Sequence, residues 1–95
     1  MKTTINLTDG HIEAGRPFRC LLCPVARAIS EVLNPKAWTS VQGIYAELHI
    51  GEEWEPVDLP DEVSGFICAF DDGRDVEPFA FELDIPAKFL KEVAA

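Results

Sequence analysis

Cys20 and Cys23 are the residues whose type and spacing are most typical of chemistry. Two cysteines three positions apart can chelate one metal ion or close a small redox disulfide. A structural zinc site needs four ligands, and the further candidates in this chain are His11, Cys68 and His49. Because Cys68 has no second ligand close to it in sequence, the strong zinc pattern is missing. We therefore expect no bound metal, with His11, Cys20, Cys23 and Cys68 as weak candidate ligands.

A redox role for the same pair needs a nucleophilic cysteine at the start of a helix. Cys23 does precede Pro24, and proline is favoured at the first helical position. No strand–helix–strand unit leads into it, however, and the intervening Leu21 and Leu22 are bulky and apolar. Free cysteine commonly behaves as a small hydrophobic residue, so buried or semi-buried thiols are the preferred interpretation. The metal-binding and redox alternatives stay open, whereas a cytosolic chain gives no reason to expect a disulfide.

No group of residues has the spacing of a catalytic site. His49 falls on the outward side of an expected strand beside Glu47, which favours an exposed surface histidine, and His11 can cap or pack locally. The carboxylates crowd into turns without an apolar pocket that would separate their pKa values. No serine has a nucleophile-elbow setting, and no glycine-rich phosphate loop occurs. We expect a protein that is not an enzyme and that uses no cofactor.

Negative charge is concentrated in the second half of the chain. Residues 1–50 carry four acidic and five basic residues, whereas residues 51–95 carry thirteen acidic and three basic residues. The acidic residues form two clusters, Glu52, Glu53, Glu55 and Asp58 followed by Asp71, Asp72, Asp75 and Glu77. One interpretation is a solvated surface on which some of the carboxylates also stabilise turns and the first turn of a helix. The other is a single negative face, formed by both clusters, that docks on a basic protein surface.

Trp54 lies inside the first acidic cluster, and an aromatic side chain surrounded by charge is typical of a binding hot spot. Trp38 and Tyr45 are further aromatic residues that the core pattern does not clearly claim. The alternative for Trp54 is packing across the edge of a sheet. Under the docking hypothesis the partner-binding residues are Glu52, Glu53, Trp54, Glu55, Asp58, Asp71, Asp72, Asp75 and Glu77.

Three expected elements position the cysteines in the first half of the chain. Residues 2–8 alternate apolar and polar side chains, with Ile5 and Leu7 on one face, and predict a strand. Residues 8–15 begin with cap residues and end at a glycine, which predicts a helical turn or two. From Pro24 to Leu33 apolar residues recur at helical spacing, and Asn34-Pro35 ends this amphipathic helix.

The acidic clusters flank a predicted hairpin and a predicted helix. In the first strand of the hairpin the inward residues are Ile44, Ala46, Leu48 and Ile50. Residues 51–53 turn the chain into a second strand that runs to Leu59, and Pro56 indicates that this strand lies at a sheet edge. A short strand at residues 39–41 precedes the pair. A helix at residues 61–70 then presents an apolar stripe to the core.

Residues 79–85 alternate in the clearest strand of the chain, and Pro86 opens a last short helix with Phe89, Leu90 and Val93 on one side. The first and last strands can pair. The order of elements and the short links predict an α+β fold. We expect a small antiparallel or mixed sheet of three to five strands, with two to four short helices packed mainly on one face.

Length and composition limit the class of protein. A chain of 95 residues is expected to form a single domain over residues 1–95, and its 47% hydrophobic residues argue against disorder. The net charge of −9 repels nucleic acid and anionic membranes, so direct binding to either is not expected. No apolar stretch is long enough to span a bilayer, and residues 1–9 lack the pattern of a signal peptide. A cytoplasmic location follows as an expectation.

Several stretches carry a resemblance to a group of viral proteins. They are His11-Ile12-Glu13-Ala14-Gly15, Cys23-Pro24-Val25-Ala26-Arg27-Ala28-Ile29, Phe66-Ile67-Cys68-Ala69-Phe70-Asp71 and Val76-Glu77-Pro78-Phe79. In these the chain resembles small uncharacterised acidic proteins of bacteriophages and prophages over most of its length. The shared motifs are structural: a helix cap, a proline at a helix start and the entry to a strand. The resemblance implies residence in the host cytoplasm. It also implies a host-takeover or anti-defence role. Such roles include that of anti-CRISPR proteins, which cover the nucleic-acid-binding face of an effector.

These observations lead to one functional expectation and two alternatives. We expect a non-enzymatic acidic binding module, a monomer or homodimer, that occupies the basic surface of a nucleic-acid-binding protein such as a CRISPR effector. One alternative is a small metal-binding or redox domain that uses Cys20 and Cys23. The other is a structural or dimerising accessory protein whose acidic half serves only solvation.

Overall fold

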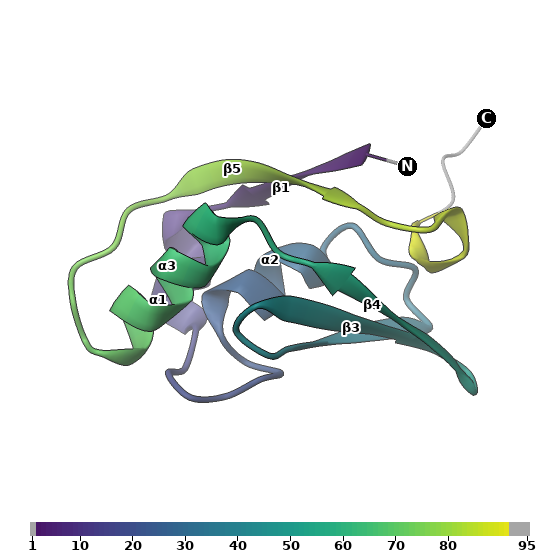
Figure 1. The fold of residues 1–95 in the computed structure, drawn as a ribbon, viewed down its shortest axis with the longest axis horizontal. Coiled ribbons are helices and arrows are strands. Elements are labelled where there is room, and N and C mark those ends of the chain that lie inside the picture. The colour runs from purple at the N-terminus through teal and green to yellow at the C-terminus, as the bar shows by residue number, and fades with distance from the viewer. Residues whose placement is uncertain (1, 92–95) are drawn as a thin grey trace.

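The computed structural model describes residues 2–91 (Figure 1). Its elements are β1 (Lys2–Leu7), α1 (Asp9–Ala14), α2 (Pro24–Ser30), β2 (Ala37–Val41), β3 (Tyr45–Ile50), β4 (Glu53–Asp58), α3 (Asp61–Asp71), β5 (Phe79–Asp84) and the 3-10 helix η1 (Ala87–Phe89). The predicted α+β class is confirmed. Val93, expected on the last helix, lies outside the described residues. None of the helices within residues 2–91 has the length and apolar composition needed to cross a membrane.

The strands form two antiparallel sheets. The first and last strands pair as predicted, with Ile5 opposite Phe81 and Leu7 opposite Phe79. The second sheet has the order β2-β3-β4, so the strand that contains Pro56 lies at an edge, also as predicted. A proline is tolerated there because an edge strand leaves one side of its backbone without a ladder partner.

One hydrophobic core lies between the two sheets and the helices. The inward residues of both sheets are buried, among them Ile5, Leu83, Ala46 and Leu48. The helices α2 and α3 and the short η1 add the buried residues Val25, Ile29, Val63, Phe66 and Phe89. In Figure 1, β1 and β5 run together along the top of the view, above α2 and α3. The strands β3 and β4 lie below them and extend to the lower right. The core therefore joins all the elements that flank the two sheets.

Two predicted boundaries are wrong by a few residues. The helix α2 ends at Ser30 instead of Leu33, because Leu33 leaves the helix to bridge with Leu90 ahead of Pro35. Ile44 was expected on the inward side of the hairpin but is 71% exposed. The strand β3 begins only at Tyr45, so Ile44 belongs to the turn after β2 and escapes the alternation.

The short helix α1 is held by a reciprocal cap. The Thr8 hydroxyl accepts a hydrogen bond from the His11 backbone N–H, and the Thr8 N–H donates to Nδ1 of His11 at 2.9 Å. The other ring nitrogen, Nε2, lies 2.5 Å from the Glu31 carboxylate beyond α2. His11 is buried, so the expected local capping role is confirmed. The contact also ties α1 to the end of α2.

Candidate functional site

The hairpin register aligns three aromatic side chains on one face of the β2-β3-β4 sheet. A two-residue turn joins β3 to β4, and Gly51 takes a positive φ of 58° at its first position. This turn places His49 opposite Trp54, and the β2–β3 register places Trp38 opposite His49. Because side chains in one cross-strand row point to the same face, the three rings stand side by side. We call Trp38, His49 and Trp54 the aromatic row.

The rings of the aromatic row are stacked. The Trp38 and His49 ring centroids are 3.9 Å apart with the planes 4° from parallel, and the His49 and Trp54 centroids are 6.2 Å apart at 21°. The indoles of Trp38 and Trp54 remain 49% and 56% exposed. His49 points outward as predicted, but its side chain is only 21% exposed because the two indoles flank it. The expectation of a freely exposed histidine is therefore wrong.

Carboxylates lie on the same face of the sheet, farther along the strands from the aromatic row. One oxygen of Glu47 lies 3.2 Å from Nε2 of His49, and the other accepts a hydrogen bond from the Tyr45 hydroxyl at 3.5 Å. Asp58 stands opposite Tyr45 in the register. We call this outer face of the sheet the aromatic face; its residues are Trp38, Ser40, Gln42, Tyr45, Glu47, His49, Trp54, Pro56 and Asp58. It contains no lysine or arginine.

The first acidic cluster is divided between the two faces of the sheet. Glu53 and Glu55 alternate with Trp54 along β4, so the pleat turns them to the side opposite the aromatic face. There Lys88 Nζ lies 3.4 Å from Glu55 and 3.9 Å from Glu53. The expected ring of carboxylates around Trp54 is therefore not formed. Of the predicted partner-binding residues, Trp54 and Asp58 share the aromatic face, and Glu52 lies in the adjoining turn.

The second acidic cluster lies far from the first. The molecule is 40 Å long, and Figure 1 shows the turn between β3 and β4 at one end of this axis and the segment between α3 and β5 at the other. Within the second cluster, Asp71 accepts a hydrogen bond from the Phe18 N–H at 2.9 Å, and Asp72 pairs with Arg74 at 3.4 Å. Asp75 and Glu77 are exposed in the segment that follows. The two clusters therefore do not form one compact negative patch.

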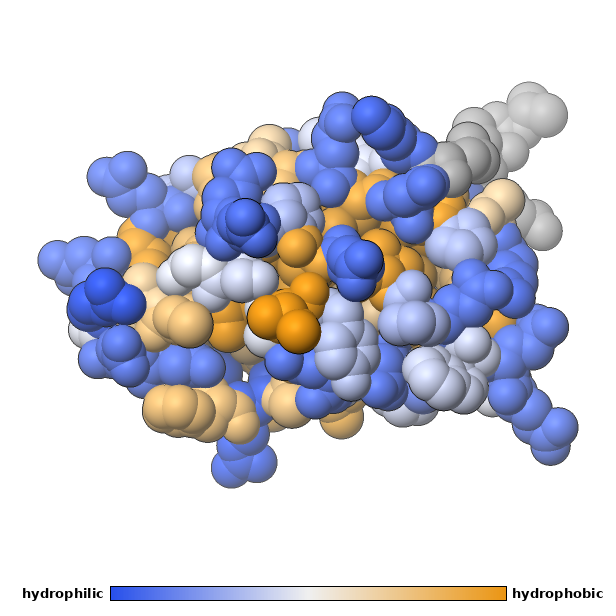
Figure 2. Space-filling view, viewed as in Figure 1, coloured by the Kyte–Doolittle hydropathy of each residue, from blue (hydrophilic) through white to orange (hydrophobic). Residues whose placement is uncertain are grey.

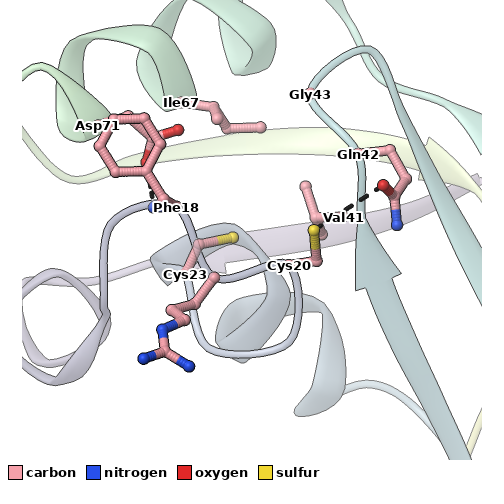
Figure 3. A pocket seen from close by; sticks show the side chains of 9 residues that line it. Phe18, Cys20, Cys23, Val41, Gln42, Gly43, Ile67 and Asp71 are labelled. Carbon is pink, nitrogen blue, oxygen red and sulfur yellow. Dashed lines mark hydrogen bonds between the residues drawn. The ribbon is translucent and has the colours of Figure 1, made fainter.

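The cysteines lie apart from the aromatic row. Cys20 and Cys23 line a pocket beside α3, and Figure 3 shows both sulfur atoms turned toward its interior. Cys23 is the N-cap of α2, where its sulfur accepts from the Ala26 N–H at 3.4 Å, and burial raises the pKa of its thiol. Cys68 is exposed on α3. Within residues 2–91 no three histidine, cysteine or carboxylate side chains gather as metal ligands, so the weak candidates are not brought together.

Sequence reasoning missed the stacking of Trp38 on His49 and the pocket beside Cys20. The Trp38–His49 contact depends on the β2–β3 register, whereas the neighbouring pairing of His49 with Trp54 had a local signal in the two-residue turn at residues 51–52. The pocket had none, because its walls come from three separate parts of the chain. Comparison with known proteins gives no further guide: no family model, curated protein or solved structure matches this chain.

Proposed function

We propose that this chain is a non-enzymatic binding module that docks through its aromatic face on the basic surface of a nucleic-acid-binding protein. The observation that carries the proposal is the aromatic row, two half-exposed indoles around His49 on a face without lysine or arginine. Exposed tryptophans clustered in this way are costly to leave in water and are the residues most enriched at binding hot spots.

The charge of the face favours a cationic partner. Glu47 and Asp58 lie on the aromatic face, and the whole chain carries a net charge of −9. A guanidinium group can stack on an indole while it pairs with a neighbouring carboxylate, so arginine fits this combination better than lysine does. Single-stranded nucleic acid also stacks on aromatic side chains, but its phosphates would meet a negative field here. A basic protein surface is therefore the favoured partner.

Docking of this kind inhibits by competition. The basic surfaces that recognise phosphates also attract carboxylates, and a face of opposite charge associates quickly. A protein whose groove is covered in this way cannot bind its nucleic acid. The resemblance to phage proteins makes a host nucleic-acid-binding protein, a CRISPR effector among them, the partner class to test first. Residence in the host cytoplasm is part of the same proposal.

The experiment has two stages. The tagged protein is first used to capture proteins from a nuclease-treated bacterial lysate, in parallel with Trp54→Ala and Glu47→Gln. We expect a basic nucleic-acid-binding protein to be retained by the wild type and largely lost by both variants. Glu82→Gln, which removes one carboxylate from the exposed side of β5, is the charge-matched control and should retain it. The captured protein is then purified and tested for release of its labelled nucleic acid.

Binding of synthetic basic peptides at different salt concentrations tests the proposed charge pairing and the preference for arginine. Binding of an arginine-rich peptide should weaken several-fold or more between about 50 mM and about 300 mM salt, since both partners are charged. An equally charged lysine peptide should bind less tightly. The same proteins captured by wild type and Trp54→Ala, or peptide affinity that ignores salt, would refute the proposal.

A further inference from the structure

A pocket of about 270 Å³ opens beside the loop that joins α1 to α2, at the other end of the β2-β3-β4 sheet from the aromatic row. Its apolar walls are Phe18 and Cys23 from the loop, Val41 at the end of β2 and Ile67 on α3. Gln42 and Asp71 add polar groups at its sides (Figure 3). A space of this size accommodates one large apolar side chain with room to adjust.

Hydrogen bonds fix the pocket walls in place. The Phe18 N–H donates to Asp71 on α3 at 2.9 Å, and the Val41 N–H donates to the Cys20 carbonyl at 2.8 Å. The loop is closed on itself by a bond from the Arg16 N–H to the Leu22 carbonyl at 2.9 Å. These bonds hold Phe18 at a positive φ of 58°, a conformation that side-chain-bearing residues rarely adopt. A strained residue held by its surroundings beside a pocket is typical of a site prepared for a ligand.

Exposed apolar side chains lie in the two chain segments that border the pocket. Six large hydrophobic side chains of the described chain are well exposed, and two of them belong to the aromatic row. The other four are Phe18, Leu21, Leu22 and Ile44, all in the α1–α2 loop or the turn after β2. Figure 2 shows a largely hydrophilic side of the molecule with apolar side chains visible in its middle and along its lower edge. Apolar groups gathered at a pocket mouth mark an interaction site more strongly than scattered ones do.

Three of the eight basic residues of the chain lie in or next to this loop, and one carboxylate, that of Asp71, lines the pocket with Arg19. Arg16, Arg19 and Arg27 lie in or next to the loop, and none of them forms an ion pair with a side chain in residues 2–91. Arg27 instead donates to the Leu22 carbonyl at 3.2 Å. The nearby Asp71 already accepts from Phe18. Charge is screened over about 8–10 Å at moderate salt, so a ligand in the pocket responds to these arginines and to Asp71 more than to the carboxylates of the distant hairpin turn.

We propose that this pocket binds a large apolar side chain, a leucine or an aromatic residue, of an acidic peptide segment in a partner protein. The anchor fills the space between Phe18 and Ile67, and acidic residues beside it pair with the unpaired arginines. Leu21 and Leu22 line an adjoining hollow that shares Phe18, Arg19 and Cys20 with the pocket. This proposal does not rest on the one made for the aromatic face, and it selects a partner of opposite charge.

Phe18→Gly gives a clean test variant. Glycine adopts a positive φ without strain, so the variant removes one wall of the pocket while it preserves the backbone. Arg19→Glu reverses a charge at the rim and leaves the apolar walls unchanged. Trp54→Ala is the matched control, because it removes an exposed aromatic side chain from the aromatic face.

The probe is a phage-displayed library of random nonapeptides selected against the folded protein. We expect enriched peptides to share one leucine or aromatic residue flanked by aspartate or glutamate. A synthetic peptide of the enriched sequence, titrated into labelled protein, should shift the backbone amide signals of Phe18, Gln42 and Ile67. Its affinity should fall roughly tenfold or more in Phe18→Gly and in Arg19→Glu and stay unchanged in Trp54→Ala.

Three results would overturn the proposal. They are a selection that enriches no acidic apolar motif, a peptide that shifts signals outside the pocket, and a Phe18→Gly variant that binds as tightly as the wild type. Sedimentation of the protein alone distinguishes one further occupant. Self-association that rises with concentration and disappears in Phe18→Gly would assign the surface to a second copy of this chain instead.

Discussion

At the scale of single residues, Cys23 is set apart from the other thiols by its position at the start of α2. It is buried and caps the helix through its sulfur, whereas Cys20 and Cys68 are exposed. A thiol reacts as the thiolate, and burial raises the pKa of Cys23, so this cysteine is a poor nucleophile. Its geometry suits a structural role better than the redox role that the Cys20–Cys23 spacing suggests.

The raised pKa of Cys23 predicts a loss of stability in alkali. In the unfolded chain this thiol ionises near its ordinary pKa of 9.0, whereas the folded protein keeps the proton to higher pH. Between the pKa of the unfolded chain and the higher pKa of the folded protein, the unfolded state binds fewer protons. The free energy of unfolding therefore falls as the pH rises through this range. Urea unfolding of wild type and Cys23→Ser between about pH 8 and pH 10 measures this, because serine caps the helix without ionising. Parallel pH curves for the two proteins would contradict the assignment.

Tryptophan and glutamate separate along β4 for a simple reason. Successive side chains of a strand point to opposite faces, so Trp54 joins His49 on the aromatic face while Glu53 and Glu55 turn toward Lys88. A cluster of acidic residues in sequence is therefore two clusters in space. The proposed docking on a basic partner depends on Glu47, beside the aromatic row, and on Asp58, farther along the same face, more than on the glutamates adjacent to Trp54 in sequence.

At the scale of elements, the packing of α1 against α2 depends on a close approach at Gly15. A Cβ atom at this position would lie 2.5 Å from Cδ of Pro24, the first residue of α2. The rigid proline ring is buried and cannot move aside without shifting its helix. Glycine is thus required here by the close approach of Pro24. Its backbone conformation does not require glycine, since a φ of −68° suits any residue.

We expect Gly15→Ala to lower the free energy of unfolding by about 1–3 kcal/mol, the usual cost of overpacking. Gly65→Ala is the matched control. Gly65 lies on the exposed side of α3 with no atom within 4 Å of an added Cβ, and alanine is the better helix former. That variant should stabilise the protein by roughly 0.5–1 kcal/mol. Chemical denaturation compares both with the wild type, and equal effects of the two substitutions would show that the α1–α2 contact is loose.

At the scale of the whole molecule, the two sheets share one core and should unfold together. Trp38 and Trp54 both belong to the β2-β3-β4 sheet, so tryptophan fluorescence reports on that sheet, whereas far-ultraviolet circular dichroism reports on all elements. Small domains with a single core usually unfold in one step. We expect coincident urea transitions by the two probes. A fluorescence transition that precedes the other would mean that the hairpin end of the molecule opens independently.

The arrangement of charge along the molecule also has a functional consequence. The aromatic face has its tryptophans beside the turn after β3, and the pocket lies beside the turn after β2, at the other end of the same sheet. One proposed surface is acidic and the other is bordered by arginines. Gln42 belongs to both surfaces, whereas the tryptophans that anchor the basic partner lie at the end of the sheet away from it.

The sequence by itself determined the elements and most of their ends. Alternation in residues 2–8 and 79–85 and helical spacing after Pro24 and Pro60 are local signals, because each element repeats at its own fixed period. The same reasoning placed Pro56 at an edge and His11 in a cap. The pairing of His49 with Trp54 was not predicted, because the turn was expected at residues 51–53 and only a turn of two residues sets this register.

Only the tertiary structure decided which residues share a surface. The pleat divided the first acidic cluster, and the path of the chain carried Asp71 to Phe18, 53 positions away. The pocket brings together a loop, the end of β2 and one side of α3, and no periodicity in the sequence records such a meeting. Contacts between distant segments depend on how the two sheets pack on their common core, and that packing is a property of all the elements at once.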